Sequence, residues 1–196
     1  MTEKIDYARI AKQRIRELVD EFKNNPYNFF SESDVKCRLF LLLYENDEFK
    51  RLKCTTDGKL ISPLHTEVTY FNDRGKLLFH VDLSAIEPKN TNVYSAPRRG
   101  EMKLAKGYRA GDCYFAIEIK LNRTNGKPKM LARWIKDIEK LEDIRRRNPL
   151  LTCFAILLDK KGHLLEEAEL FDMQRNFPQV KIVYANANSQ DYFINF

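Results

Sequence analysis

The run from Leu151 to Leu158 constrains the fold of this chain most, because nearly every residue in it is apolar. A strand that is apolar on both faces needs a covering layer on each side, which is typical of a central strand in an α/β sheet. Helical spacing of apolar residues is found before and after this run, from Pro128 to about Arg147 and from Leu164 to Asn176. Val180 to Tyr184 then predicts a last strand. The expected fold class is therefore α/β, a mixed sheet flanked by helices.

Two further helices are expected at the start of the chain. Residues 4–23 carry apolar side chains close to helical spacing, and this pattern ends before Pro26. Ser31 is suited to an N-cap, with Asp34 three positions later, so a second helix is predicted to begin there. Val35 begins the apolar face of this second helix.

Between the second and third helices, three segments show the period-two alternation of strands. They are His65–Phe71, Leu77–Ile86 and Cys113–Leu121. In the third segment every second residue is apolar, whereas Glu118 and Lys120 lie on the opposite face. In the second segment Asp82 lies with His80 and Ser84 opposite the apolar face. If these two strands pair, the carboxylates of Asp82 and Glu118 converge on one point.

Two converging carboxylates repel each other and therefore need a cation between them. Oxygen ligands of this kind select a hard cation such as Mg²⁺ or Mn²⁺. Lys120 points to the same side as Glu118, where an ammonium can orient a water molecule and offset charge on a phosphate. Together these groups are the parts required for hydrolysis of a phosphodiester.

Asp82 followed by Glu118-Ile119-Lys120 resembles the D…(D/E)-x-K motif of the PD-(D/E)XK nuclease superfamily. The predicted order of elements, in which a helix precedes three strands, a helix and a strand, is similar to the core of that superfamily. The resemblance covers roughly residues 29 to 160. It implies a restriction-endonuclease-like mixed sheet with αβββαβ order.

The resemblance also implies a function, the metal-dependent hydrolysis of phosphodiester bonds in DNA. The implied metal ligands are the carboxylates of Asp82 and Glu118 and the carbonyl oxygen of Ile119, with Mg²⁺ or Mn²⁺ as the cofactor. Many members carry another acidic residue on the first core helix, and Glu32 occupies the matching place as a further catalytic ligand. Lys120 is implied to position the attacking water. A core of this size often acts as a dimer, so a homodimer is one expectation.

The interval between the two halves of the motif is longer than in many members and contains a polar insertion, Glu87 to Asp112. A long loop inside a compact domain is usually functional or disordered. This one is rich in cations that can contact nucleic-acid phosphates. Those cations are Arg98, Arg99, Lys103, Lys106 and Arg109. On the helix after the motif, Lys140 is a candidate nucleic-acid contact and Asp137 a candidate supporting residue. Val81 stands where the motif commonly has proline.

The same residues allow less specific interpretations. Asp82 alone is also typical of a half-solvated strand, and Glu118 with Lys120 is also typical of a surface ion pair. The runner-up function is a nuclease-like module that binds nucleic acid without cleavage, or a subunit that needs a partner. A third interpretation is a structural subunit with an incidental acidic cluster, for which neither metal dependence nor salt-sensitive DNA binding is expected.

Composition adds mild support for a polyanionic partner such as DNA, because the formal net charge is +6, although many basic proteins bind no nucleic acid. At 196 residues and 43% apolar content, one domain over residues 1–196 is expected, with a nuclease-like core at about residues 29–160 and residues 1–25 as an N-terminal helix that precedes it. The four cysteines form no C-x-x-C pair, and no segment approaches the roughly 18 apolar residues that cross a bilayer. A cytoplasmic protein without membrane contact is therefore expected.

Overall fold

The structure of the chain is a computed structural model, and it describes residues 6–71, 77–91, 107–109, 113–123, 127–162, 164–188 and 192–196. Within these residues a seven-stranded mixed sheet has the order β5-β3-β4-β6-β7-β8-β9. Its strands are β3 (Leu64–Phe71), β4 (Leu77–Ile86), β5 (Gly107–Arg109), β6 (Cys113–Asn122), β7 (Thr152–Asp159), β8 (Val180–Asn186) and β9 (Tyr192–Ile194). The small strands β1 (Lys53–Cys54) and β2 (Leu60–Ile61) form a separate antiparallel pair.

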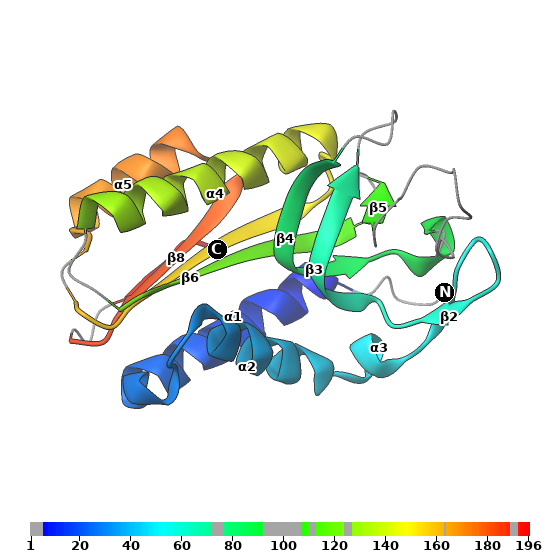
Figure 1. Cartoon of the computed structure of the whole chain (residues 1–196), viewed down its shortest axis with the longest axis horizontal. Helices are drawn as coiled ribbons and strands as arrows, with labels where there is room; N and C mark the ends of the chain where they lie inside the picture. The colour runs from blue at the N-terminus through cyan, green and yellow to red at the C-terminus, as the bar shows by residue number, and fades with distance from the viewer. Residues whose placement is uncertain are drawn as a thin grey trace, which may run out of the picture.

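Helices cover both faces of the large sheet (Figure 1). One face carries α1 (Tyr7–Asn24) and α2 (Glu32–Tyr44), and the other carries α4 (Lys127–Arg147) and α5 (Glu167–Asn176). The shorter helices are η1 (Pro26–Asn28), α3 (Asp47–Lys50) and η2 (Pro88–Asn90). Among the helices of the described residues, none combines the length and apolar character needed to cross a membrane.

Two hydrophobic cores follow from this layering. The first lies between the sheet and α1 and α2, and includes Leu18, Leu39 and Ile117. The second lies between the sheet and α4 and α5, and includes Trp134, Ala155 and other buried residues. The alternation of apolar side chains along β6 and β7 supplies both cores, because successive residues of a strand point to opposite faces. The nearly continuous apolar run in β7 is thereby explained, since β7 is a central strand paired in parallel with both β6 and β8.

The expected fold class is confirmed, and α2, β3, β4, β6, α4 and β7 follow one another in the αβββαβ order. Three expectations need correction. Val180–Tyr184 is not the last strand, because β9 returns antiparallel to β8 and pairs with it. The insertion after β4 holds two short elements, η2 and β5, which the sequence pattern did not predict. Asp82 and Ser84 do not share one face of β4, because the alternation switches between Val81, which packs in the second core, and Leu83, which packs in the first; the fully buried Ser84 hydroxyl lies 3.0 Å from the Tyr70 hydroxyl in the second core.

The start of α2 is fixed by the capping box that the sequence predicts. The Ser31 hydroxyl accepts a hydrogen bond from the backbone N–H of Asp34 at 3.2 Å. In return, the Asp34 carboxylate accepts from the backbone N–H groups of Ser31 and Phe30, both at 2.8 Å. These bonds satisfy N–H groups that have no partner within a helix. They also make Glu32 the first residue of α2, and so place it at the edge of the candidate site.

Candidate active site

The candidate site lies where β4 and β6 stop pairing with each other. The last register pair in this direction is Leu83 with Ile117, and continuing the ladder would set Asp82 opposite Glu118. Instead the Asp82 carboxylate accepts a hydrogen bond from the backbone N–H of Ile119 at 2.8 Å. This bond satisfies a strand N–H that β4 no longer pairs with. The separation of the two strands therefore leaves room beside the edge of β6 for side chains from other elements.

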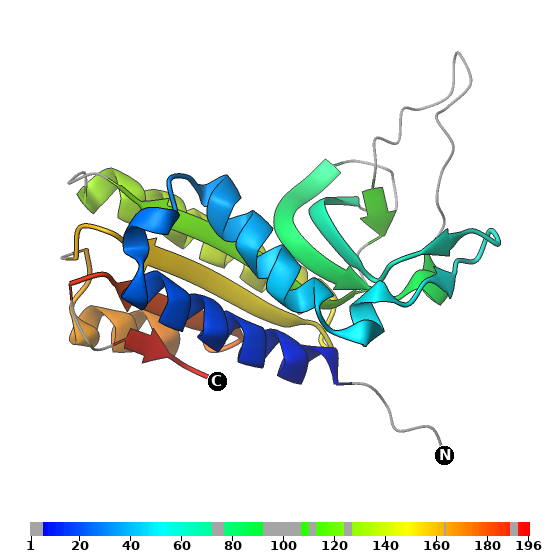
Figure 2. The ribbon, with the colours of Figure 1, turned by 90° about the horizontal axis from the view of Figure 1, so that it is seen from below.

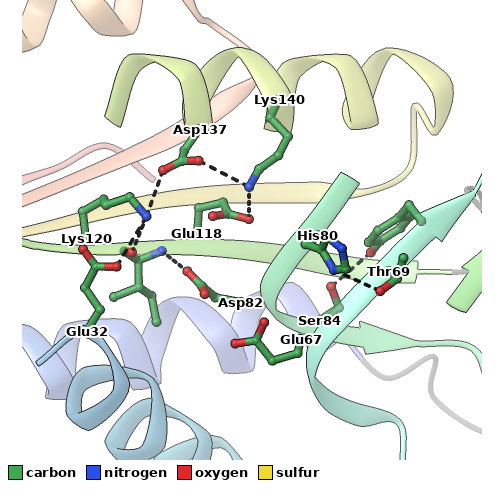
Figure 3. A network of polar contacts seen from close by, with 12 residues as sticks. Glu32, Glu67, Thr69, His80, Asp82, Ser84, Glu118, Lys120, Asp137 and Lys140 are labelled. Carbon is green, nitrogen blue, oxygen red and sulfur yellow. Dashed lines mark hydrogen bonds and ion pairs between the residues drawn. The ribbon is translucent and has the colours of Figure 1, made fainter. Parts of the chain in front are cut away.

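Glu118 lies in the middle of β6 and points toward α4 (Figure 3). It is only 3% exposed, and its Oε1 lies 2.6 Å from the Lys140 ammonium on α4. Burial raises the pKa of Glu118 to about 8, with further contributions from the charges of Asp82 and Asp137, whereas Lys140 opposes the shift. A negative charge at Glu118 therefore depends on nearby positive charge.

Lys120 follows two residues later on the same face of β6. Its ammonium lies 3.0 Å from the Asp137 carboxylate, 3.6 Å from that of Glu32 and 3.3 Å from the Ile119 carbonyl oxygen, to which it donates. Although burial by itself lowers the pKa of Lys120, the carboxylates of Asp137 and Glu32 raise it above its ordinary value. Lys120 is therefore a charged hydrogen-bond donor held between α2 and α4.

Asp137 links the two lysines of this half of the site. Its two oxygens lie 3.0 Å from the Lys120 ammonium and 3.3 Å from the Lys140 ammonium. Asp137 and Lys140 are three residues apart on α4 and so share one face of the helix, which points at β6 (Figure 3). Both residues were candidates from the sequence, and the structure places both beside Glu118 and Lys120.

The Asp82 side of the site contains two residues that the sequence analysis did not identify. The Lys36 ammonium on α2 lies 3.7 Å from the Asp82 carboxylate and also pairs with Glu67 on β3. Burial by itself lowers the pKa of Lys36, but the bond to Glu67 and the charge of Asp82 raise it. Lys36 was detectable, because it lies one helical turn after Glu32 and so shares its face.

Glu67 carried no comparable signal. It occupies the position between the register pairs Thr66–Leu83 and Val68–Val81, across from Asp82. Its backbone φ is +53°, a left-handed conformation that is uncommon for residues other than glycine and costs of order 1–3 kcal/mol. The alternation of β3 is interrupted at this one residue, and the Glu67 side chain lies on the Asp82 side of the site (Figure 3), where it pairs with Lys36.

The predicted residues Glu32, Asp82, Glu118 and Lys120 therefore lie near one another around β6, although their carboxylates are not clustered. Within the described part of the chain, no group of three or more His, Cys, Asp or Glu residues is arranged to hold a metal ion. Each carboxylate is instead paired with a protein cation or N–H group. The donor set itself, which consists of carboxylate and carbonyl oxygens, has the chemistry that suits Mg²⁺ or Mn²⁺. The ammonium groups of Lys140 and Lys36 supply the positive charge that offsets the carboxylates of Glu118 and Asp82.

The residues predicted to contact phosphates lie only partly in the described part of the chain. Arg98, Arg99, Lys103 and Lys106 lie outside the described residues. Lys140 lies inside the site, where its ammonium is engaged by Glu118 and Asp137.

Comparisons with known proteins give only distant likenesses. No protein-family model matches the chain, and no curated protein matches it either. Among solved structures, cAAA-bound NucC of P. aeruginosa ATCC27853 is similar with a TM-score of 0.48 and 9% identity, covering 98% of this chain and 85% of that chain. For cAAA-bound NucC of E. coli MS115-1 the TM-score is 0.48 at 9% identity, covering 99% of this chain and 84% of that chain. For the apo form of the E. coli protein the TM-score is 0.48 at 11% identity, covering 93% of this chain and 82% of that chain. At this level of similarity, ligands and activity do not transfer to this chain.

Proposed function

We propose that this chain is a metal-dependent nuclease that hydrolyses phosphodiester bonds in DNA. The observation that carries the proposal is the meeting of Glu118 and Lys120 from β6, Asp82 from β4 and Glu32 from α2 beside the stretch of β6 that does not pair with β4. Acidic and basic side chains from separate elements converge there on a strand whose other face is wholly apolar. Clusters of charged groups that shift one another's pKa values, as at Glu118, are typical of functional sites.

In this proposal Asp82, Glu118 and the Ile119 carbonyl oxygen bind Mg²⁺ or Mn²⁺, and Glu32 completes the ligand set. The bound cation would polarise the scissile phosphate and lower the pKa of a water molecule that serves as the nucleophile. Because Lys140 now pairs with Glu118 and Lys36 with Asp82, both ammonium groups have to release their carboxylates. Each lysine retains an alternative acidic partner, Asp137 for Lys140 and Glu67 for Lys36.

In this proposal Lys120 acts as a hydrogen-bond donor to the reacting groups. The carboxylates of Asp137 and Glu32 raise its pKa above the ordinary value, which favours its charged form. A protonated ammonium can donate to the attacking water and to a phosphate oxygen, and so it orients the nucleophile and offsets developing charge. Asp137 holds Lys120 in place while it does so.

A direct test is cleavage of single-stranded, duplex and branched DNA by the purified protein in Mg²⁺, Mn²⁺ or EDTA. We expect metal-dependent cleavage by the parent protein and at least a ~100-fold loss in Glu118→Gln and in Asp82→Asn, which preserve side-chain size. Glu139→Gln is the matched control, because Glu139 is an exposed carboxylate on α4 outside the network described above. Metal-dependent cleavage by Glu118→Gln at the parental rate would refute the assignment.

A non-cleaving nucleic-acid-binding module is the second candidate, and one observation favours it. The carboxylates of Glu118 and Asp82 are paired with lysines, and no cluster of metal-ligating side chains is formed within the described residues. A site neutralised permanently in this way would bind DNA in a salt-sensitive manner without cutting it. Binding with no cleavage in either metal would favour this candidate over the nuclease.

A further inference from the structure

Two large aromatic side chains are exposed at one end of the molecule. Tyr27 in η1 and Phe30 just before α2 are 79% and 74% exposed, respectively. Their neighbour Phe29 is buried and packs against Phe22. The segment is thus anchored to the core by Phe29, while the aromatic rings on either side of it face solvent. Exposed apolar groups that lie together and are bordered by polar side chains are typical of interaction surfaces.

One cation, the ammonium of Lys160, lies beside both of these rings. The Lys160 ammonium is 5.1 Å from the centre of the Tyr27 ring and 5.8 Å from the centre of the Phe30 ring, so the two rings share one cation. Lys160 also donates to the Phe29 carbonyl oxygen at 3.1 Å, and Arg123 donates to the Phe30 carbonyl oxygen at 2.9 Å. These bonds tie the segment between α1 and α2 to the ends of β6 and β7. We call Tyr27, Phe30, Arg123 and Lys160 the aromatic platform.

The aromatic platform adjoins the candidate active site. Arg123 follows Lys120 by three residues on an extended segment, which corresponds to roughly 10 Å at the rise of a strand. On the other side Phe30 precedes Glu32 by two residues, and Glu32 contacts Lys120. Figure 2 shows the turn between α1 and α2 at the same end of the sheet as the ends of β6 and β7. A chain of a few nucleotides can span this separation.

We propose that the aromatic platform binds a single-stranded segment of the nucleic acid whose phosphodiester is cleaved at Glu118 and Lys120, which rests on the nuclease function proposed above. Bases stack on the rings of Tyr27 and Phe30, and phosphates contact Lys160 and Arg123. Aromatic rings interleaved with cations are the combination that binds single strands without sequence preference.

Charge on and around the platform favours nucleic acid over an acidic or apolar protein partner. Acidic residues of the neighbouring helices have partners of their own, because Glu32 pairs with Lys120, Asp34 caps α2, and Glu21 accepts a hydrogen bond from Arg38 at 2.6 Å. The positive charges of Lys160 and Arg123 point to a polyanion, and the two flat rings can stack on any base. In a duplex the bases are stacked on one another, so their faces become accessible to the rings only where the strands are separated.

The test is the binding of a single-stranded oligonucleotide carrying the fluorescent base 2-aminopurine, measured in EDTA so that no cleavage occurs. We expect the base to be quenched on binding to the parent protein. In the double variant Tyr27→Ala with Phe30→Ala, quenching should be lost and affinity should fall by about 30-fold or more. Tyr27→Phe should retain both, because the ring is kept. Phe171→Ala on α5 is the matched control, since Phe171 is also an exposed aromatic residue, at 52%.

A second measurement tests the cations. Lys160→Gln should reduce the salt dependence of single-strand binding, whereas Arg175→Gln, which removes one exposed positive charge on α5, should not. The platform proposal is overturned if the double variant binds the single strand as the parent does, even if duplex cleavage is normal. If instead the platform variants lose binding but no metal supports cleavage by the parent, the platform stands and the nuclease proposal fails. Absence of any single-strand binding by the parent would also overturn the platform.

Discussion

The two halves of the candidate site are built differently. The half formed by β6 and α4 contains Glu118, Lys120 and Asp137, and it rests on a strand that pairs with β7 from Phe115 to Asn122. The half formed by β3, β4 and α2 contains Asp82 and Glu67, whose side chains are 24% and 61% exposed, on a hairpin that separates from β6. The first half thus sets a fixed arrangement of charge. The second half is more exposed, and we expect a ligand to reach the carboxylates from this side.

This difference explains how a set of metal-ligating residues can lack a ready-made metal cluster. Glu118 is held against Lys140 by burial, whereas Asp82 is held at Ile119 by one hydrogen bond and by a longer ion pair with Lys36. For the two carboxylates to share a cation, we expect the Asp82 half to move, because Glu118 is nearly fully buried and contacts Lys140 on α4. Among residues outside the proposed ligand set, we therefore expect substitutions in the β6–α4 half to have the larger effects on activity.

The largest expected effect is on Lys120 and its partner Asp137. Lys120→Gln should lower kcat by about 10²–10³-fold, because the ammonium is proposed to act on charge that develops in the transition state. Asp137→Asn should lower kcat by about 10- to 100-fold with little change in KM, because Asp137 acts through Lys120. Steady-state cleavage assays with Glu139→Gln as the control measure both effects. An Asp137→Asn enzyme with parental kcat would show that Lys120 needs no second anchor.

A smaller effect, on stability, follows from the buried carboxylate of Glu118. Its pKa is raised from 4.5 to about 8, so the folded state binds more protons than the unfolded chain between these values. The contribution of Glu118 to stability is therefore fully present below about pH 4.5 and is lost as the pH rises through about 8. Without metal, Glu118→Gln should melt close to the parent at low pH and above it at pH 9.

Thermal melts across this pH range measure the difference, which amounts to about 2–4 °C for each kcal/mol in a chain of this size. Adding Mg²⁺ at pH 8 should raise the Tm of the parent protein but not that of Glu118→Gln, since a cation that binds only the folded state stabilises it. If the parent and the variant keep the same difference in Tm at every pH, then Glu118 does not titrate in this window.

The β6–α4 half was also the more predictable half from sequence. Alternation in β6 and helical spacing in α4 set the directions of Glu118, Lys120 and Asp137, because each depends only on the local period of its own element. The capping box at Ser31 likewise placed Glu32 from local chemistry. The separation of β4 from β6 was not predictable, because it depends on how the hairpin packs across the sheet. The pairing of β9 with β8 also depends on tertiary contacts, since its three residues carry little pattern.

The smallest expected effect is on the melting temperature of variants at Glu67, and it tests the half of the site that contains Asp82. A positive φ in the middle of β3 disfavours side chains with a branched β-carbon, at a cost of roughly 1–2 kcal/mol relative to glycine. Glu67→Val should therefore melt about 2–8 °C below Glu67→Gly. The neighbouring exposed residue Thr66, which pairs regularly with Leu83, is the matched control. There the order should reverse, because glycine weakens an ordinary strand position and valine favours it. The same order at both positions would mean that the left-handed turn at Glu67 does not shape the Asp82 half of the site.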